Sequence, residues 1–240
     1  SIGMYNESSD YSSLELEIVN CAFTNAGGNC VYIQPEITSL FVTECDFTTP
    51  SDLSSYAQQY LIWPYHAGTI TITNNTFDGD GLTRGAIHLG DGATSGTTKA
   101  TISGNTIIGF ERAVTVALLN NAANTVSITG NIFEDIEISE QTNTDPRNTA
   151  TIYIHSVATS GTTISYTGNV LTGASERIVY NDNRTLETNE VITTFSNNTI
   201  GGQAVENLSN SSYDYNVAMI GDIKYETLAE AISAATEGSE

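Results

Sequence analysis

Five stretches of eight residues decide the fold: ITITNNTF (70–77), ATISGNTI (100–107), VSITGNIF (126–133), ISYTGNVL (164–171) and TTFSNNTI (193–200). Their shared pattern is two apolar positions separated by one residue, then an Asn-Asn or Gly-Asn pair, and then an apolar residue two positions after the Asn that ends the pair. Two earlier copies have a cysteine in place of that Asn. The anchor column of the repeat is therefore Cys21, Cys45, Asn75, Asn105, Asn131, Asn169 and Asn198.

Each copy of the repeat predicts a short strand, a turn and a second strand. Apolar residues at alternate positions indicate a strand with one buried face. Asn and Gly at the pair tolerate the positive φ that a tight turn needs. A third apolar stretch follows in most copies, as in Val31–Ile33 and Ile152–Ile154. A unit this small cannot bury its apolar side alone, so we expect the copies to stack in parallel register, about 4.8 Å apart.

The repeat resembles that of the right-handed, single-stranded parallel β-helix of the pectate-lyase-like superfamily. The resemblance covers about residues 14–208 and implies an all-β fold of about seven rungs, with the anchor side chains stacked in a ladder. We expect the β-helix to span residues 1–213. This scaffold is found in lyases, hydrolases, adhesins and inert stalks, so the fold alone does not define a function.

Residues 214–240 depart from the repeat and predict a short strand or hairpin followed by a helix. Leu228, Ala231, Ile232 and Ala235 share one helical face, and Thr227 is placed to cap it. The segment is similar to the unit with which a β-helix module begins in large bacterial surface proteins. That resemblance implies that the chain is covalently part of a larger multi-module protein at the cell surface or secreted. The other interpretation is a cap on the open end of the stack.

Composition excludes several functions. The chain of 240 residues has a net charge of −21, from 28 acids against 7 Lys and Arg. Binding to nucleic acid or to an anionic membrane surface is therefore not expected. No apolar run approaches the length of a membrane span, so no membrane insertion of this fragment is expected. Three cysteines are too few for a disulfide framework, and we expect Cys21 and Cys45 to be buried thiols that extend the Asn column.

An acidic cluster is the first candidate site. Asp78 and Asp80 in the sequence FDGDG, with His88 and Asp91 further on, have the carboxylates that a glycosidase needs. Asp78, Asp80 and Asp91 have the oxygen ligands that Ca²⁺ prefers, so calcium is the one cofactor that the sequence suggests. They would belong to an acidic groove between long loops at one corner of the helix. The alternative is that FDGDG is a turn, since a chain with 28 acids has clusters by chance.

A second candidate is the aromatic sequence YAQQYLIWPYH, which contains Tyr56, Tyr60, Trp63 and Tyr65. Exposed rings of this kind stack on sugars and would form a glycan-binding platform. In the alternative, Trp63 fills the core and the tyrosines lie at its rim. The arginines 84, 112 and 177 precede third strands and are possible bases of a polysaccharide lyase. The alternative for them is ion pairing with neighbouring acids.

These observations favour a non-catalytic, extracellular module of a bacterial cell-surface protein. It would act as a stalk or as an adhesin-like surface that binds a glycan or a host protein, without a nucleotide or redox cofactor. The second hypothesis is a carbohydrate-active β-helix enzyme, a polysaccharide hydrolase or lyase, that uses the acidic corner groove.

Overall fold

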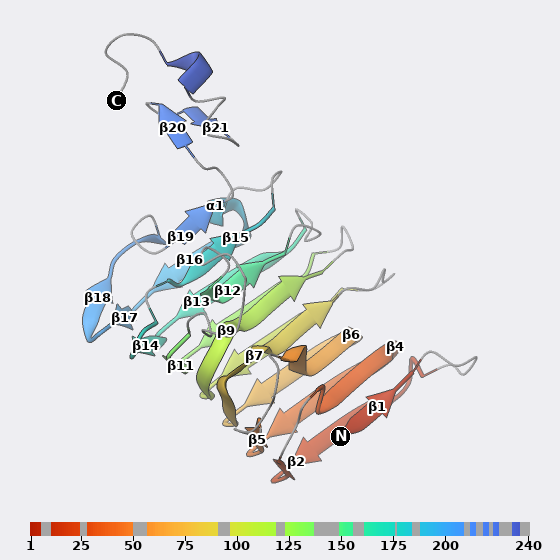
Figure 1. Ribbon diagram of the computed structural model, residues 1–240. Helices are drawn as coiled ribbons and strands as arrows, with labels where there is room; N and C mark the ends of the chain where they lie inside the picture. The colour runs from red at the N-terminus through yellow and green to blue at the C-terminus, as the bar shows by residue number, and fades with distance from the viewer. Residues whose placement is uncertain are drawn as a thin grey trace.

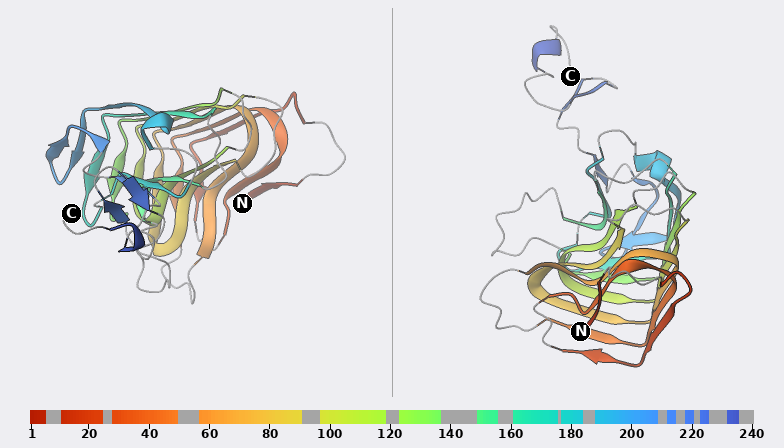
Figure 2. Two further views of the ribbon diagram at one scale, coloured as in Figure 1. Left: turned by 90° about the horizontal axis from the view of Figure 1, so that it is seen from above. Right: turned by 90° about the vertical axis from the view of Figure 1, so that its right-hand side faces the viewer.

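The computed structural model is a parallel β-solenoid, in which the chain winds into stacked coils with strands along three faces (Figure 1). It describes residues 1–5, 11–24, 28–49, 57–90, 97–118, 123–136, 149–155, 161–175, 177–183, 188–208, 212–214, 218–220, 223–225 and 232–235. The two views in Figure 2 show successive coils lying against one another, with the chain bending at corresponding places. The predicted all-β fold with parallel stacked coils is thus confirmed.

The first face contains the first strand of each repeat. Neighbouring strands of this face pair in parallel and in register. One buried column therefore consists of Leu40, Ile70, Ala100, Val126 and Ile164. The strands of this face are β2 (Glu15–Val19), β4 (Val31–Thr43), β6 (Ala57–Thr73), β8 (Lys99–Ser103), β10 (Thr125–Thr129), β13 (Thr163–Thr167) and β16 (Ile192–Ser196).

The second face follows the Asn turn and is shorter. It consists of β3 (Ala22–Phe23), β5 (Asp46–Thr48), the starts of β7 (Thr76–Gly90) and β9 (Thr106–Ala117), β11 (Ile132–Glu134), β14 (Val170–Thr172) and β17 (Asn198–Ile200). Its inward side chains pack in a column; Phe47 lies 4.8 Å from Phe23 and 4.7 Å from Phe77, with nearly parallel rings. Those stacked rings bury a large apolar area against neighbouring coils.

The third face is built partly from strands that turn a corner. Its strands are β1 (Ile2–Met4), the starts of β4 and β6, the ends of β7 and β9, β12 (Ala150–Ile154), β15 (Val179–Asn181) and β19 (Ser212–Asp214). Both β4 and β6 continue from this face onto the first face, and the β4–β6 register shifts between Ile33 and Glu36, where they turn.

The number of complete turns is smaller than the sequence predicted. Seven strands do stack on the first face, but the solenoid completes about 5 turns rather than about seven rungs. One reason lies at the C-terminal end: β18 (Gln203–Val205) reverses direction and pairs antiparallel with β17, so this coil does not close in the manner of the others. A four-residue helix, α1 (Thr188–Val191), precedes β16.

Beyond the solenoid, β20 (Ala218–Ile220) and β21 (Ile223–Tyr225) form a separate antiparallel hairpin. Figure 1 shows it past the last coil, followed by a helical turn at 232–234. Of the side chains predicted to share a helical face, Ile232 is 65% exposed. Thr227, Leu228 and Ala231 lie outside the described residues.

The Asn anchors form a hydrogen-bonded ladder through the core. The amide Nδ2 of Asn105 donates to Oδ1 of Asn131 at 3.0 Å, and Nδ2 of Asn131 donates to Oδ1 of Asn169 at 3.0 Å. Asn75 and Asn198 continue the ladder at its two ends. Each oxygen also accepts the backbone N–H of the anchor one coil earlier, as Asn131 does from Asn105 at 3.0 Å. The polar groups of a dry core are thereby satisfied.

The two cysteines at the start of the column differ from each other. Cys45 is buried, and its Sγ accepts the backbone N–H of Cys21 at 3.4 Å. Cys21 is exposed, so the expectation that both thiols are buried is wrong for this residue. Cys21 lies in the turn after β2, and among the described strands β2 pairs only with β4, so this end of the column is less covered.

Candidate functional site

Aromatic side chains gather on the outer side of the third face. Val31 and Ile33 in β4 point into the core, so Tyr32 between them points outward. Register places Trp63 beside Tyr32 in the next coil. In later coils His88, Thr115, Tyr153 and Tyr180 occupy the same outward column.

The rings contact one another across the coils. Tyr5 lies 5.4 Å from Tyr32, and Tyr32 lies 5.6 Å from Trp63, measured between ring centroids. Trp63 lies 4.8 Å from His88. We call these residues, with the others linked to them by ring contacts, the aromatic band: Tyr5, Tyr32, Tyr60, Trp63, Tyr65, His66, His88, Tyr153, His155 and Tyr180.

The band is open at one end and buried at the other. Tyr5 is 64% exposed, and Tyr32, Trp63 and Tyr65 are half-buried. His88 is 3% exposed and Tyr153 is 5% exposed. A ligand that stacks on aromatic rings therefore has access to the N-terminal end of the band, on coils that contain β1, β4 and β6.

Polar contacts fix the open end in place. The hydroxyl of Tyr32 donates to that of Tyr65 at 3.1 Å, and the indole Nε1 of Trp63 donates to the carbonyl of Gly90 at 3.2 Å. His66 follows Tyr65, and burial lowers its pKa. These bonds hold the rings in defined orientations, which lowers the conformational entropy that binding would cost.

The buried end of the band is organised around Arg112. Its guanidinium lies 3.6 Å from the ring centre of Tyr153 and 3.4 Å from the carboxylate of Glu111. Arg112 and Thr115 both donate to the hydroxyl of Tyr60, which is 4% exposed. The ion pair with Glu111 matches the alternative interpretation of Arg112, in which it pairs with a neighbouring acid. A buried charge with this many partners stabilises the scaffold rather than facing a substrate.

A small cavity adjoins the open end of the band. It has a volume of about 250 Å³, and its walls include Gly3, Tyr5, Gly28, Asn29 and Tyr32. Ser1 and Ile2 line it as well, and among the described lining residues no side chain is charged. The carbonyl oxygen Oδ1 of Asn29 is buried, and no described residue donates a hydrogen bond to it.

The aspartates of FDGDG lie at the corner between the second and third faces. The backbone N–H of Asp80 donates to the Asp78 carboxylate at 3.1 Å, and Asp80 has a φ of 48°. This is the local geometry of an Asx turn, which is the structural alternative considered for the motif. His88 lies on the third face, where its ring contacts are with the aromatic band, and Asp91 lies outside the described residues.

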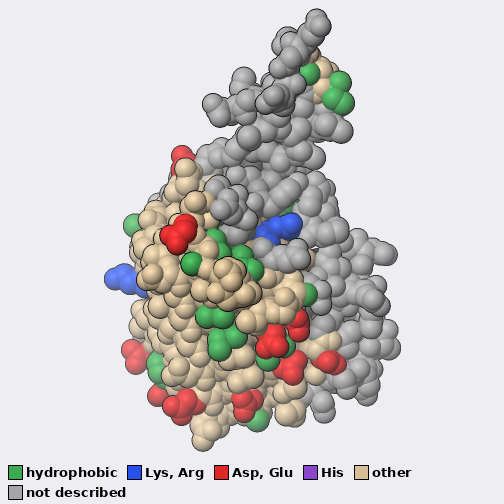
Figure 3. Space-filling view, turned by 90° about the vertical axis from the view of Figure 1, so that its left-hand side faces the viewer, with side chains coloured by type: hydrophobic (Ala, Val, Ile, Leu, Met, Phe, Trp, Pro, Cys, Tyr) green, Lys and Arg blue, Asp and Glu red, His purple; other side chains and the backbone are tan. Residues whose placement is uncertain are grey.

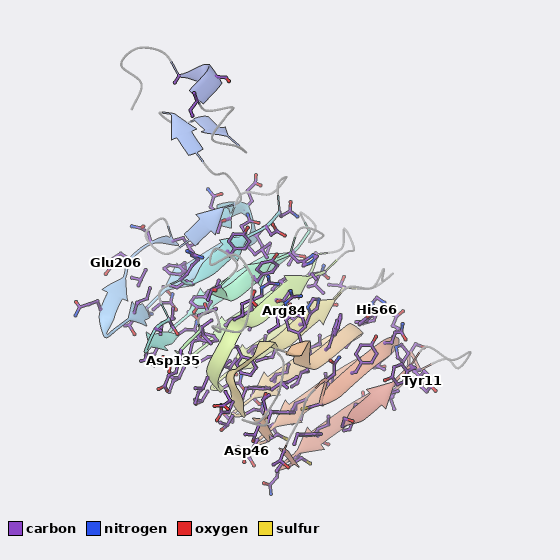
Figure 4. All side chains as sticks on the ribbon, viewed as in Figure 1. Tyr11, Asp46, His66, Arg84, Asp135 and Glu206 are labelled. Atoms are coloured by element: carbon purple, nitrogen blue, oxygen red, sulfur yellow. The ribbon has the colours of Figure 1, made fainter. Side chains whose placement is uncertain are left out.

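One pair of carboxylates shares a column. Register places Asp78 beside Ile108, and Ile108 beside Glu134, so the two acids are two coils apart, about 9.6 Å between backbones. Asp135 next to Glu134 accepts the backbone N–H of Ala174 at 2.9 Å. In Figure 4, Asp46 and Asp135 lie on the opposite side of the solenoid from His66. On the side drawn in Figure 3, acidic side chains are dispersed over a largely uncharged surface.

The predicted calcium site has no matching cluster of ligands in the part of the chain that the structure describes. Within those residues, no three His, Cys, Asp or Glu side chains come close enough to hold one metal ion. Asp78 and Asp80 are both included in that statement, whereas Asp91, the third predicted ligand, is not. The calcium site therefore stays a prediction.

The predicted glycan-binding residues are distributed unequally. Trp63 and Tyr65 belong to the open end of the band, Tyr60 is buried beside Arg112, and Tyr56 lies outside the described residues. Tyr32, Tyr153 and Tyr180 were not among the residues predicted to bind a glycan. A signal existed, because Tyr32 and Tyr153 are each flanked by two apolar residues in a third strand, which places the ring outward.

The fold and the aromatic surface define a class, a parallel β-solenoid with an aromatic band on its third face. Comparison with protein-family models, with curated proteins and with solved structures finds no match to this chain. Among the described residues, no helix is long and apolar enough to cross a membrane.

Proposed function

We propose that this chain is a non-catalytic β-solenoid module that binds a glycan through the open end of the aromatic band. The observation that supports the proposal is the continuous contact of Tyr5, Tyr32, Trp63 and Tyr65 on one face, with each ring at least partly accessible. Pyranose rings have apolar C–H faces that pack on aromatic faces, while their hydroxyls bond to nearby polar groups.

The charge of the chain favours a neutral glycan. A net charge of −21 repels uronates and sulfated sugars over the Debye length of physiological salt. The basic side chain nearest the band, Arg112, is buried against Glu111 and Tyr153 at its closed end. An anionic glycan would therefore meet no accessible arginine among the band's described partners.

Affinity electrophoresis against a panel of soluble polysaccharides tests the proposal. Neutral polysaccharides should retard the wild-type chain, and Tyr32→Ala or Trp63→Ala should abolish the retardation. Phe41→Ala is the matched control, because Phe41 is a half-buried ring on the same strand, β4, but faces outward from the first face. Retention of binding in Tyr32→Ala and Trp63→Ala, or equal loss in Phe41→Ala, would contradict the proposal.

The setting we propose is the surface of a cell, with this module as one part of a larger secreted or surface-attached protein. The excess of acids over basic residues and the many Thr, Ser and Asn of the strands support solubility in an extracytoplasmic setting. Labelling of intact producing cells with an antibody against the module tests this. Labelling that requires permeabilised cells would contradict it.

The enzymatic alternative rests on the Asp78 and Glu134 column. The backbones of the two acids are about 9.6 Å apart, just beyond the roughly 6.5–9.5 Å that separates the carboxyl groups of an inverting glycosidase, and Ile108 lies between them. Reducing-sugar assays on the same polysaccharide panel decide the matter. Turnover that is lost in both Asp78→Asn and Glu134→Gln would establish a hydrolase and overturn the non-catalytic proposal.

A further inference from the structure

We infer that the open edge of β2 is a docking site for an extended peptide segment that carries basic side chains at alternate positions. The segment would add to the first face as one more parallel strand. Three features of this end of the solenoid carry the inference: backbone groups that face an open edge, apolar columns that are uncovered, and two acids on the outer side of β2. The inference does not depend on glycan binding by the aromatic band.

The backbone of β2 is bonded to a neighbouring strand on one side only. β2 lies at the end of the stack in Figure 1, and among the described strands it pairs only with β4. The carbonyl of Leu14 and the N–H of Asn20 both bond to β4. Because every second residue of a parallel strand bonds to the same neighbour, Glu15, Glu17 and Val19 direct their N–H and C=O groups to the open edge. An added strand would bond to these groups.

The anchor column also has room for one more coil. Sγ of Cys45 accepts the backbone N–H of Cys21, the anchor one coil earlier. The equivalent position before Cys21 has no strand among the described residues, and Cys21 is exposed. Its Sγ donates to the carbonyl of Val19 at 3.2 Å, which is a weak bond that an added strand would replace.

The apolar columns of the solenoid are uncovered at this end. Leu16 is partly exposed, whereas Leu40 and Ile70, which follow it in the same column, are 0% and 1% exposed. Phe23 is partly exposed and stacks on Phe47, which is 1% exposed. A strand that adds to β2 and continues over β3 would therefore bury alternate apolar side chains against Leu16 and Phe23.

The outward side chains of β2 define the charge of the partner. Glu15 and Glu17 are exposed, and the β4 residues beside them are uncharged. The equivalent positions of the next four strands contain no acid; they are Ser39, Phe41, Thr43, Thr69, Thr71, Thr73, Lys99, Thr101, Ser103, Thr125, Ser127 and Thr129. Basic side chains at alternate positions of an added strand would lie beside both carboxylates.

A second copy of this chain fits the edge less well than a basic segment. If two β2 edges paired, the glutamates of both copies would lie on the same side of the joined sheet and repel one another. The net charge of −21 on each copy adds to that repulsion. The two acids therefore select against self-association and for a strand of opposite charge.

Fluorescence anisotropy with the full chain and a labelled synthetic peptide, KIKITGNTF, tests the inference. The peptide has the pattern of the repeat, and its lysines would lie beside Glu15 and Glu17. We expect saturable binding that weakens as the salt concentration rises, because the ion pairs are exposed. The peptide EIEITGNTF, in which glutamates replace the lysines, should bind about tenfold more weakly or not at all.

Charge reversal in the protein separates the proposed contact from a general loss of structure. Glu17→Lys should weaken the binding of KIKITGNTF about tenfold and strengthen that of EIEITGNTF. Glu206→Lys is the matched control, because it makes the same change in net charge at an exposed residue, and Figure 4 shows Glu206 at the opposite end of the solenoid from Tyr11. This control should bind both peptides as wild type does.

Hydrogen exchange locates the bound peptide. On addition of KIKITGNTF, the amides of Glu15, Glu17 and Val19 should gain protection, and the amides of β13 should not. No binding, equal binding of the two peptides, equal binding by wild type and Glu17→Lys, or protection that appears only outside β1–β3 would overturn the inference. Sedimentation of the wild type as a dimer in which the same three amides are already protected would also overturn it, because a second copy would then occupy the edge.

Discussion

Replacing Asn131 with leucine removes the centre of the Asn ladder. The Asn131 side chain is fully buried and makes four hydrogen bonds. Its Nδ2 donates to the carbonyl of Ile102 and to Oδ1 of Asn169, and its Oδ1 accepts from the backbone N–H and from Nδ2 of Asn105, each at 3.0 Å. Leucine has a similar size, can make none of these bonds and leaves no room for water to replace them.

The magnitude follows from the groups left without that partner. Two of them lose their hydrogen-bond partner: the backbone N–H of Asn105 and one amide hydrogen of Asn105. The carbonyl of Ile102 stays paired with β10 in the parallel β8–β10 ladder, and Oδ1 of Asn169 keeps the backbone N–H of Asn131 as a donor. At about 1–3 kcal/mol for each buried unsatisfied group, the free energy of unfolding falls by about 2–6 kcal/mol. That is a large part of the roughly 5–15 kcal/mol of a typical domain.

Urea denaturation followed by far-UV circular dichroism measures the loss, and hydrogen exchange shows where it occurs. Because solenoids can unfold in parts, we expect the amide of Asn105 to lose protection before amides in distant coils. The control is Thr125→Ala, an exposed change in β10 of the same coil, which should cost less than about 0.5 kcal/mol. If Asn131→Leu is as stable as the control, the ladder does not stabilise the solenoid and our account of the core is wrong.

Three further changes test the core. Cys45→Asn should raise the free energy of unfolding by about 1 kcal/mol in the same urea titration. Oδ1 of Asn75 already accepts the backbone N–H of residue 45 and could also accept the side-chain amide of an asparagine there. A loss of stability would count against the ladder geometry. Gly130 has a φ of 64° and open space around an added Cβ, so the cost of a substitution is set by the left-handed backbone, which Asn tolerates better than Val. Gly130→Asn should therefore lower the free energy of unfolding by about 1 kcal/mol less than Gly130→Val, and equal losses would contradict the left-handed turn. Burial raises the pKa of the Cys30 thiol from 9.0 to about 12, so above about pH 9 the thiol of the unfolded chain ionises before that of the folded chain, and the free energy of unfolding falls as pH rises. Thermal unfolding between pH 8 and 11 should show a smaller fall for Cys30→Ala than for wild type. An identical pH profile would refute the burial of this thiol.

The first two faces of the solenoid could be predicted because the residues that define them lie at fixed distances in the sequence from the anchor residue. The strand, the Asn turn and the following apolar residue keep constant offsets from the anchor, so in-register stacking follows once the copies are aligned. The anchor column also predicts hydrogen bonding, since stacked amides satisfy one another. The number of complete turns could not be predicted, because closure of the end coils depends on features outside the repeat, such as the reversal at β18.

The third face was harder to predict because its distance from the anchor varies. Anchor intervals range from 24 to 38 residues, so Tyr32, Trp63, Tyr153 and Tyr180 have no common offset in the sequence, and only strand register brings them into one band. Local sequence did identify Trp63 and Tyr65. It could not show that Tyr60, only three residues before Trp63, is buried beside Arg112, because that contact joins residues 52 positions apart.

The fluorescence of Trp63 tests the account most directly, because it is the only tryptophan of the chain and lies within the aromatic band. Titration with the oligosaccharide of a polysaccharide that retards the protein should change its emission in a saturable way. The change should vanish in Tyr32→Ala and persist in Phe41→Ala. A glycan that binds without altering Trp63 emission, in wild type and both variants alike, would place the binding surface elsewhere and contradict the account.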